Sequence, residues 1–117
     1  MDEQLFKQRT KNLALRVSEL TESLPASTAA HVIGRQLLRS ATSVGANYRP
    51  ACRGKSPADV LAKLAIVEEQ ADETVYWLEL LVEAGIVPES RVAHLMKESH
   101  EIVAMTVASI KTLRGRR

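Results

Sequence analysis

The residues with the clearest chemical use are arginines in a stretch that contains no acid. Between Thr28 and Ser56 the basic side chains are Arg35, Arg39, Arg49, Arg53 and Lys55. On a helix these four arginines fall within roughly 80° of one another, along about 27 Å. The planar guanidinium group matches phosphate oxygens, so such a row suits a nucleic-acid backbone. We therefore predict nucleic-acid contacts at Arg35, Arg39, Arg49 and Arg53.

The next stretch has the opposite charge and supplies an alternative role for the arginines. Residues 57–84 hold seven acids against the single base Lys63. On a helix four of the acids share one face: Glu68, Asp72, Glu79 and Glu83. The arginines could pair with these carboxylates, in the same subunit or in a neighbouring one. The sequence leaves both roles open.

Pro50 interrupts the predicted arginine row. Proline has no amide to bond to the Ala46 carbonyl, and it disfavours helical geometry at the preceding residue, Arg49. A kink there would swing Arg49 and Arg53 away from the line of Arg35 and Arg39.

The sequence offers no pattern for catalysis, for a metal or for a cofactor. A di-metal helical bundle needs Glu-x-x-His pairs, but Thr28, Arg91 and Lys97 stand three positions before the histidines His31, His94 and His100. One cysteine and scattered histidines make a poor metal site, and no Gly-rich phosphate loop is present. Cys52 is expected to be an inert, buried thiol. We therefore expect a protein without enzymatic activity.

Helix signals divide the chain into four segments, at about 3–24, 28–54, 57–84 and 88–113. Ser27 or Thr28 caps the second segment, Ser56-Pro57 starts the third, Gly85 ends it, and Pro88 opens the fourth. Short loops between them predict an all-α, antiparallel, up-down-up-down bundle. The bundle forms a single domain, 1–113, followed by a basic tail, 114–117. The tail arginines, Arg114, Arg116 and Arg117, are either a solvated end or further nucleic-acid contacts.

The apolar pattern gives every segment a core face, and the third segment a second one. Its core stripe is Val60, Leu64, Val67, Ala71, Val75, Leu78 and Val82. The second stripe lies about 120° or more around the helix and contains Ala62, Ile66, Trp77, Leu80 and Ala84. Glu73 falls inside it and would need a partner if buried. We expect Ala62, Ile66, Glu73, Trp77 and Leu80 to form a subunit interface of a homo-oligomer; the alternative is that Trp77 packs against the first helix of its own subunit.

Composition and length agree with one helical domain. The chain has 117 residues, a net charge of +2 and 3% aromatic residues. No apolar run approaches the roughly 18 residues of a membrane span, and the first residues carry charges where a signal peptide is apolar. A single cysteine adds to the expectation of a cytoplasmic protein.

Several motifs together resemble a known bacterial family. They are Arg39-Ser40, Ser43, Asn47-Tyr48, the Ser-Pro-Ala-Asp start at 56–59, and the Thr-x-Tyr-Trp-Leu-Glu-Leu run that ends at Leu80. In this combination the chain resembles the bacterial four helix bundle protein family, which includes proteins encoded in intervening sequences of large-subunit ribosomal RNA genes. It is also similar to the accessory variability determinant of diversity-generating retroelements.

This resemblance implies an up-and-down four-helix bundle that assembles as a ring-like homo-oligomer, commonly a pentamer, without enzymatic activity or cofactors. For the retroelement relatives it implies nucleic-acid binding beside a reverse transcriptase. Two functions therefore stay open for this chain. One is a nucleic-acid-binding adaptor, with RNA or DNA as partner. The other is a structural scaffold whose charges serve subunit assembly or a protein partner.

Overall fold

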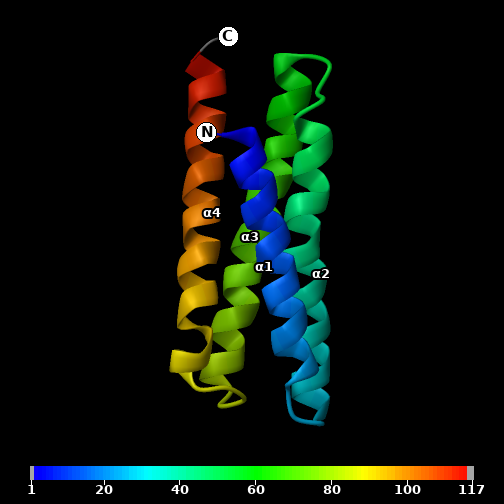
Figure 1. Cartoon of the computed structure of the whole chain (residues 1–117), viewed down its shortest axis with the longest axis vertical. Helices are drawn as coiled ribbons and strands as arrows, with labels where there is room; N and C mark the ends of the chain where they lie inside the picture. Colours follow the sequence, from blue (N-terminus) through cyan, green and yellow to red (C-terminus); the bar gives the residue numbers. More distant parts are fainter. Residues whose placement is uncertain (1, 116–117) are drawn as a thin grey trace.

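The computed structural model describes residues 2–115, which form four helices and contain no strand. They are α1 (Glu3–Glu22), α2 (Thr28–Ala51), α3 (Pro57–Glu83) and α4 (Glu89–Gly115). In Figure 1 the chain descends along α1, returns along α2, descends along α3 and returns along α4. The bundle measures 48 × 20 × 20 Å, so the helices lie nearly along its long axis.

Side-chain caps and a glycine set the helix ends. The Asp2 carboxylate accepts a hydrogen bond from the Leu5 amide at 3.1 Å. Ser27 and Ser56 use their hydroxyls in the same way at the starts of α2 and α3. Such bonds satisfy amides that have no partner inside the helix. Gly85 follows α3 with a φ of 73°, a conformation that glycine adopts at little cost.

Several helix ends differ from the predicted ones. α1 ends at Glu22 and not at 24, α3 ends at Glu83 and not at 84, and α4 begins at Glu89 and not at 88. α2 was expected to reach residue 54 but ends at Ala51. Pro50 donates no hydrogen bond, and beyond it the chain tightens, because the Arg53 amide bonds to the Pro50 carbonyl at 3.1 Å. At the other end of the chain, α4 continues through Gly115. Arg114 therefore belongs to the last turn of α4, which continues beyond the predicted helix end at about 113.

Neighbouring helices pack in a ring around the core. α2 packs against α1 and α3, α3 against α4, and the seam between α1 and α4 is the least extensive. The α1–α2 contacts Phe6–Tyr48, Thr10–Gly45 and Thr21–Gly34 run in opposite directions along the two helices. This register places the first turn of α1 beside the last turn of α2.

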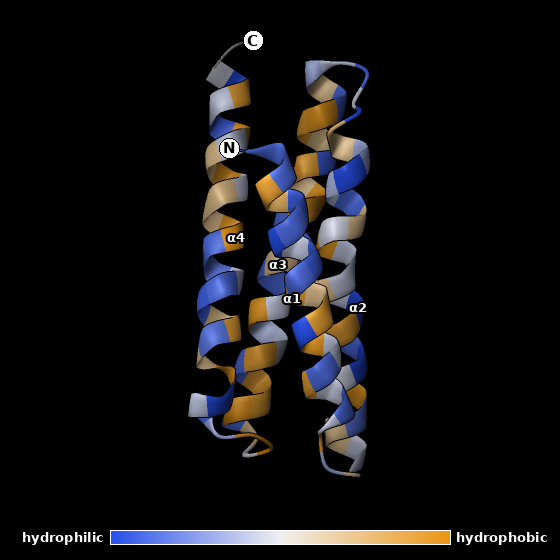
Figure 2. Ribbon diagram, in the orientation of Figure 1, coloured by the Kyte–Doolittle hydropathy of each residue, from blue (hydrophilic) through white to orange (hydrophobic). Residues whose placement is uncertain are grey.

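The predicted apolar stripes line the core. α1 buries Phe6, Leu13, Val17 and Leu20, and α2 buries Ile33, Leu37, Ala41, Val44, Tyr48 and Ala51. Figure 2 shows apolar and polar residues alternating around each helix, as expected of helices with one buried face. Removing these side chains from water is the main term that stabilises the bundle. In α3 the buried set also includes Leu61 and Leu81, which the predicted stripe had missed.

Several residues with hydroxyl side chains are buried in this core. The fully or nearly buried polar residues are Thr10, Ser40, Thr74, Ser99 and Thr106. Ser99 and Thr106 donate to carbonyls one turn back in α4. The Thr74 hydroxyl lies 3.0 Å from the Ser40 hydroxyl and joins α3 to α2. Each hydroxyl is thus satisfied despite its burial.

Candidate nucleic-acid interface

The first two arginines of the predicted row have partners within the bundle. A guanidinium nitrogen of Arg35 lies 2.9 Å from the His31 ring nitrogen one turn earlier in α2. Arg39 forms an ion pair with Glu73 of α3 and also bonds to Gln36 at 3.2 Å. One arginine of α2 is therefore paired with a carboxylate of α3, which is the kind of pairing that the alternative role predicted. The acid involved is Glu73, which lies outside the predicted acidic face.

The last two arginines lie at the other end of α2 and are exposed. Arg49 is still helical, whereas Arg53 lies in the turn after Ala51. Within residues 2–115, no side-chain hydrogen bond or ion pair engages either guanidinium group. The four arginines therefore do not form one row along a single helix.

Arg49 instead belongs to a basic groove between α1 and α2. The groove has a volume of about 330 Å³, and its lining includes Lys7 and Lys11 of α1 beside Arg49 of α2. The two lysines are one helical turn apart, so they present their ammonium groups on the same face. No carboxylate lines this groove among the described residues. We call Lys7, Lys11 and Arg49 the basic groove residues.

A close contact between backbones forms the floor of this groove. Gly45 of α2 faces Thr10 of α1, and a Cβ added at Gly45 would meet the Thr10 hydroxyl oxygen at 3.0 Å. Thr10 is buried and its hydroxyl donates to the Lys7 carbonyl at 3.1 Å. The missing side chain at Gly45 lets α1 and α2 approach closely. The basic groove residues then stand on both sides of a shallow floor.

The three basic groove residues differ in whether their charges are already paired within the subunit. Lys7 forms an exposed ion pair with Glu3 at 3.2 Å. Such i,i+4 pairs on a helix surface are weak and are readily exchanged for another anion. Lys11 and Arg49 are exposed and have no ion pair among the described residues. Two free cations and one weakly held cation therefore converge on one groove, which suits an anion with several negative oxygens.

Sequence reasoning missed the two lysines because it treated each helix on its own. Lys7 and Lys11 form a visible i,i+4 pair on α1. Placing them beside Arg49 requires the antiparallel register of α1 and α2. An apolar alignment of Phe6 with Tyr48 would have supplied that register, since the two rings are in contact at 4.5 Å between centroids.

Comparisons with known proteins agree with the fold. The model of the 23S rRNA-intervening sequence protein family matches residues 3–108, most of the chain. The chain belongs to this family. A crystal structure of a protein with unknown function from the S23 ribosomal protein family, from Bacteroides thetaiotaomicron VPI-5482, is 34% identical with a TM-score of 0.87. The match covers 95% of this chain and 99% of that one. No curated protein matches the sequence.

The predicted subunit interface of this intervening-sequence family member divides into two parts. Ala62 and Ile66 are exposed, and the Ile66 side chain is 41% exposed. Trp77 and Leu80 are partly buried against the core of their own subunit. Glu73 has the partners that its position required, since it pairs with Arg39 and accepts a bond from the Trp77 indole at 3.3 Å.

The remaining predicted residues lie far from a common site. Arg114 is exposed on the last turn of α4. Arg116 and Arg117 lie outside the described residues. Over the described part of this intervening-sequence family member, no three His, Cys, Asp or Glu residues gather in a way that could hold a metal ion. Within the same residues, every helix is too short or too polar to cross a membrane.

Proposed function

We propose that this member of the 23S rRNA-intervening sequence protein family is a non-enzymatic accessory protein that binds nucleic acid as a homo-oligomer. The observation that carries the proposal is the basic groove between α1 and α2. There Lys7, Lys11 and Arg49 converge without a carboxylate in the lining. Contacts of this kind attract phosphates irrespective of base sequence.

Assembly would strengthen such contacts. Three bases per subunit give a weak site, but a ring repeats the site around its circumference, and linked sites bind a long polyanion far more tightly than one alone. The exposed Ala62 and Ile66 on α3 supply apolar surface for a neighbouring copy. The ring-like pentamer follows from the family resemblance. Arg35 and Arg53 are proposed as secondary contacts at the two ends of α2.

The test compares the chain with a charge-reversed groove. Binding of a fluorescent single-stranded RNA and a DNA duplex is measured by anisotropy across a salt series. In wild type the logarithm of affinity should fall linearly with that of salt. The double variant Lys11→Glu/Arg49→Glu should bind at least about tenfold more weakly and with a shallower slope.

Lys97→Glu/Lys111→Glu supplies the matched control, because it changes the net charge by the same amount at two exposed lysines of α4 outside the basic groove. It should change binding little. Binding that is absent, insensitive to salt, or equally reduced by the control would refute the proposal.

The scaffold function has its own supporting observation, the Arg39–Glu73 ion pair between α2 and α3. It shows that opposite charges on these helices can meet directly. If the same pairing joined subunits, high salt would reduce the assembly mass in light scattering, while added RNA would leave it unchanged. An assembly mass that is independent of salt contradicts the scaffold function.

A further inference from the structure

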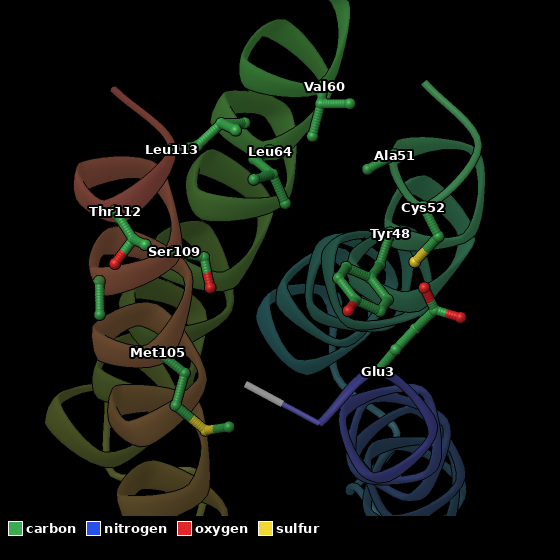
Figure 3. A pocket seen from close by; sticks show the side chains of 11 residues that line it. Glu3, Tyr48, Ala51, Cys52, Val60, Leu64, Met105, Ser109, Thr112 and Leu113 are labelled. Atoms are coloured by element: carbon green, nitrogen blue, oxygen red, sulfur yellow. The ribbon is translucent and has the colours of Figure 1, made fainter. Parts of the chain in front are cut away.

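A second cavity lies at the end of the bundle where α1 begins. It is a cleft of about 700 Å³ between the first turn of α1, the last turn of α2, the start of α3 and the end of α4 (Figure 3). Apolar side chains form most of its wall, including Val60 and Leu64 of α3 and Leu113 of α4. This volume falls in the range of sites that hold small organic molecules.

The cleft exists because the fourth side of the bundle is incomplete. α1 has 20 residues and α4 has 27. Arg9 holds the two helices together lower down, through bonds to Glu98 at 2.8 and 2.9 Å and to Glu101 at 2.8 Å. Beyond this contact the cleft separates the first turn of α1 from Met105, Ser109 and Leu113 of α4.

Polar groups converge on one wall of the cleft. Figure 3 shows the Glu3 carboxylate reaching toward Cys52, with the Tyr48 ring beside them. Cys52 lies close enough to both Tyr48 and Glu3 to interact with each of them. Burial raises the pKa of both Tyr48 and Cys52, so the phenol and the thiol stay protonated in neutral solution.

The cleft lining combines one carboxylate with several hydroxyl groups. The hydroxyls belong to Tyr48, Ser109 and Thr112. Among the described residues, Glu3 is the only charged one in the lining. Lys7 also pairs with Glu3, but through an exposed contact that the carboxylate can share. A ligand that complements this lining brings a positive charge to the Glu3 carboxylate.

We propose that the cleft binds a hydrophobic amine, with its ammonium group at Glu3. The apolar body of the ligand lies against Val60, Leu64 and Leu113. A fatty acid or another anion of the same size is rejected by the Glu3 charge, and an alcohol leaves that charge without a partner. Phe6 fixes the Tyr48 ring by an edge contact at 4.5 Å and 63°, so this part of the cleft wall is held in place before the ligand arrives.

Three probes of equal chain length test the proposal by isothermal titration calorimetry: octylamine, 1-octanol and octanoate. Octylamine should bind at one saturable site per chain and more tightly than the other two. Glu3→Gln should weaken octylamine binding by about tenfold, the loss expected for a charge-assisted hydrogen bond. It should leave 1-octanol nearly unchanged. Equal binding of the three probes, or an unchanged octylamine affinity in Glu3→Gln, would overturn the proposal.

A second variant blocks the cleft without touching its polar wall. Ala108 is exposed and lines the cavity from α4, so Ala108→Trp should fill the space and abolish octylamine binding while the melting temperature is retained. The same variant should bind nucleic acid as wild type does, and Lys11→Glu/Arg49→Glu should bind octylamine as wild type does. The two proposals therefore fail separately. Retained octylamine affinity in a folded Ala108→Trp protein counts against the cleft as the site.

Discussion

Arg39 on α2 and Glu73 on α3 form an ion pair within one subunit. The sequence had assigned the first residue to a nucleic-acid surface and the second to a subunit interface. Their pairing shows that these two surfaces meet at the seam between α2 and α3. The indole of Trp77 joins them through its bond to Glu73 at 3.3 Å.

Glu73→Gln should release Arg39 without unfolding the protein. The Arg39 side chain is 50% and the Glu73 side chain 33% exposed, so the free energy of unfolding should fall by less than about 1 kcal/mol in urea titrations. Nucleic-acid affinity should rise by a few fold, because Arg39 becomes available to phosphates. Glu79→Gln changes the net charge identically at an exposed site on the same helix. Equal effects of the two variants would show that net charge, and not the release of Arg39, is responsible.

At the buried hydroxyl pair Ser40–Thr74, removing one hydroxyl should destabilise the protein less than adding side-chain volume. Ser40→Ala removes the partner of the Thr74 hydroxyl, which keeps a bond to the Gln70 carbonyl at 2.9 Å. We expect a loss of about 0.5–1.5 kcal/mol. Thr74→Leu adds volume where Thr74 is fully buried, and should cost about 1–3 kcal/mol through overpacking. Thermal and chemical denaturation measure both, and a Thr74→Leu protein of wild-type stability would contradict the close packing of α2 on α3.

Gly45→Ala should separate the first two helices. The new methyl group would lie 3.0 Å from the hydroxyl oxygen and 3.3 Å from the Cβ of Thr10, a buried, β-branched residue. Thr10 has little freedom to move, so we expect stability to fall despite the higher helix propensity of alanine. The double variant Gly45→Ala/Thr10→Ala should recover part of the loss. Gly115→Ala is the control, since nothing lies within 4 Å of its added Cβ.

The seam between α1 and α4 should weaken in acid. Hydrogen bonds from Arg9 hold the pKa of Glu98 below its ordinary value of 4.5, and the charges of His94 and Arg16 act in the same direction. Since the folded pKa is lower than the unfolded one, the stabilisation is fully present above the unfolded pKa. It is lost as the pH falls through the folded pKa.

Chemical denaturation across a pH series checks this linkage. Arg9→Met removes the guanidinium donors, so the variant should be less stable near neutral pH and lose less stability on acidification. Lys7→Met, which removes a base from the exposed Glu3 pair of the same helix, serves as the control. A wild-type acid profile in Arg9→Met would assign the pH dependence to other carboxylates, such as Asp59, whose pKa Lys63 also lowers.

Much of the bundle could be predicted from the sequence because its signals are local. Ser56 followed by Pro57 starts α3, and the 3.6-residue pattern on α1 places Phe6, Leu13 and Val17 in the core. The second stripe of α3 was harder. Its residues Trp77 and Leu80 pack partly on their own bundle, so an apolar residue alone does not distinguish a seam inside a subunit from a contact outside it.

The candidate sites depend on which residues of different helices lie side by side. The residue pattern of one helix does not show this. The basic groove needs the register that brings Lys11 beside Arg49. The cleft needs the loose seam between α1 and α4, together with the meeting of Glu3 and Cys52 at the start of α1 and just after the end of α2. The sequence also predicted that α2 continues to residue 54, because the helical pattern does not stop at Pro50.

The exposed ion pair between Glu3 and Lys7 has one member in each of the two cavities. A phosphate that draws Lys7 into the basic groove leaves the Glu3 carboxylate to an ammonium group, and an ammonium at Glu3 releases Lys7 in turn. Thermodynamic linkage requires the two effects to be equal, so each ligand would raise the affinity for the other by the same factor. The first turn of α1 would then couple the binding of a polyanion to the binding of a small cation.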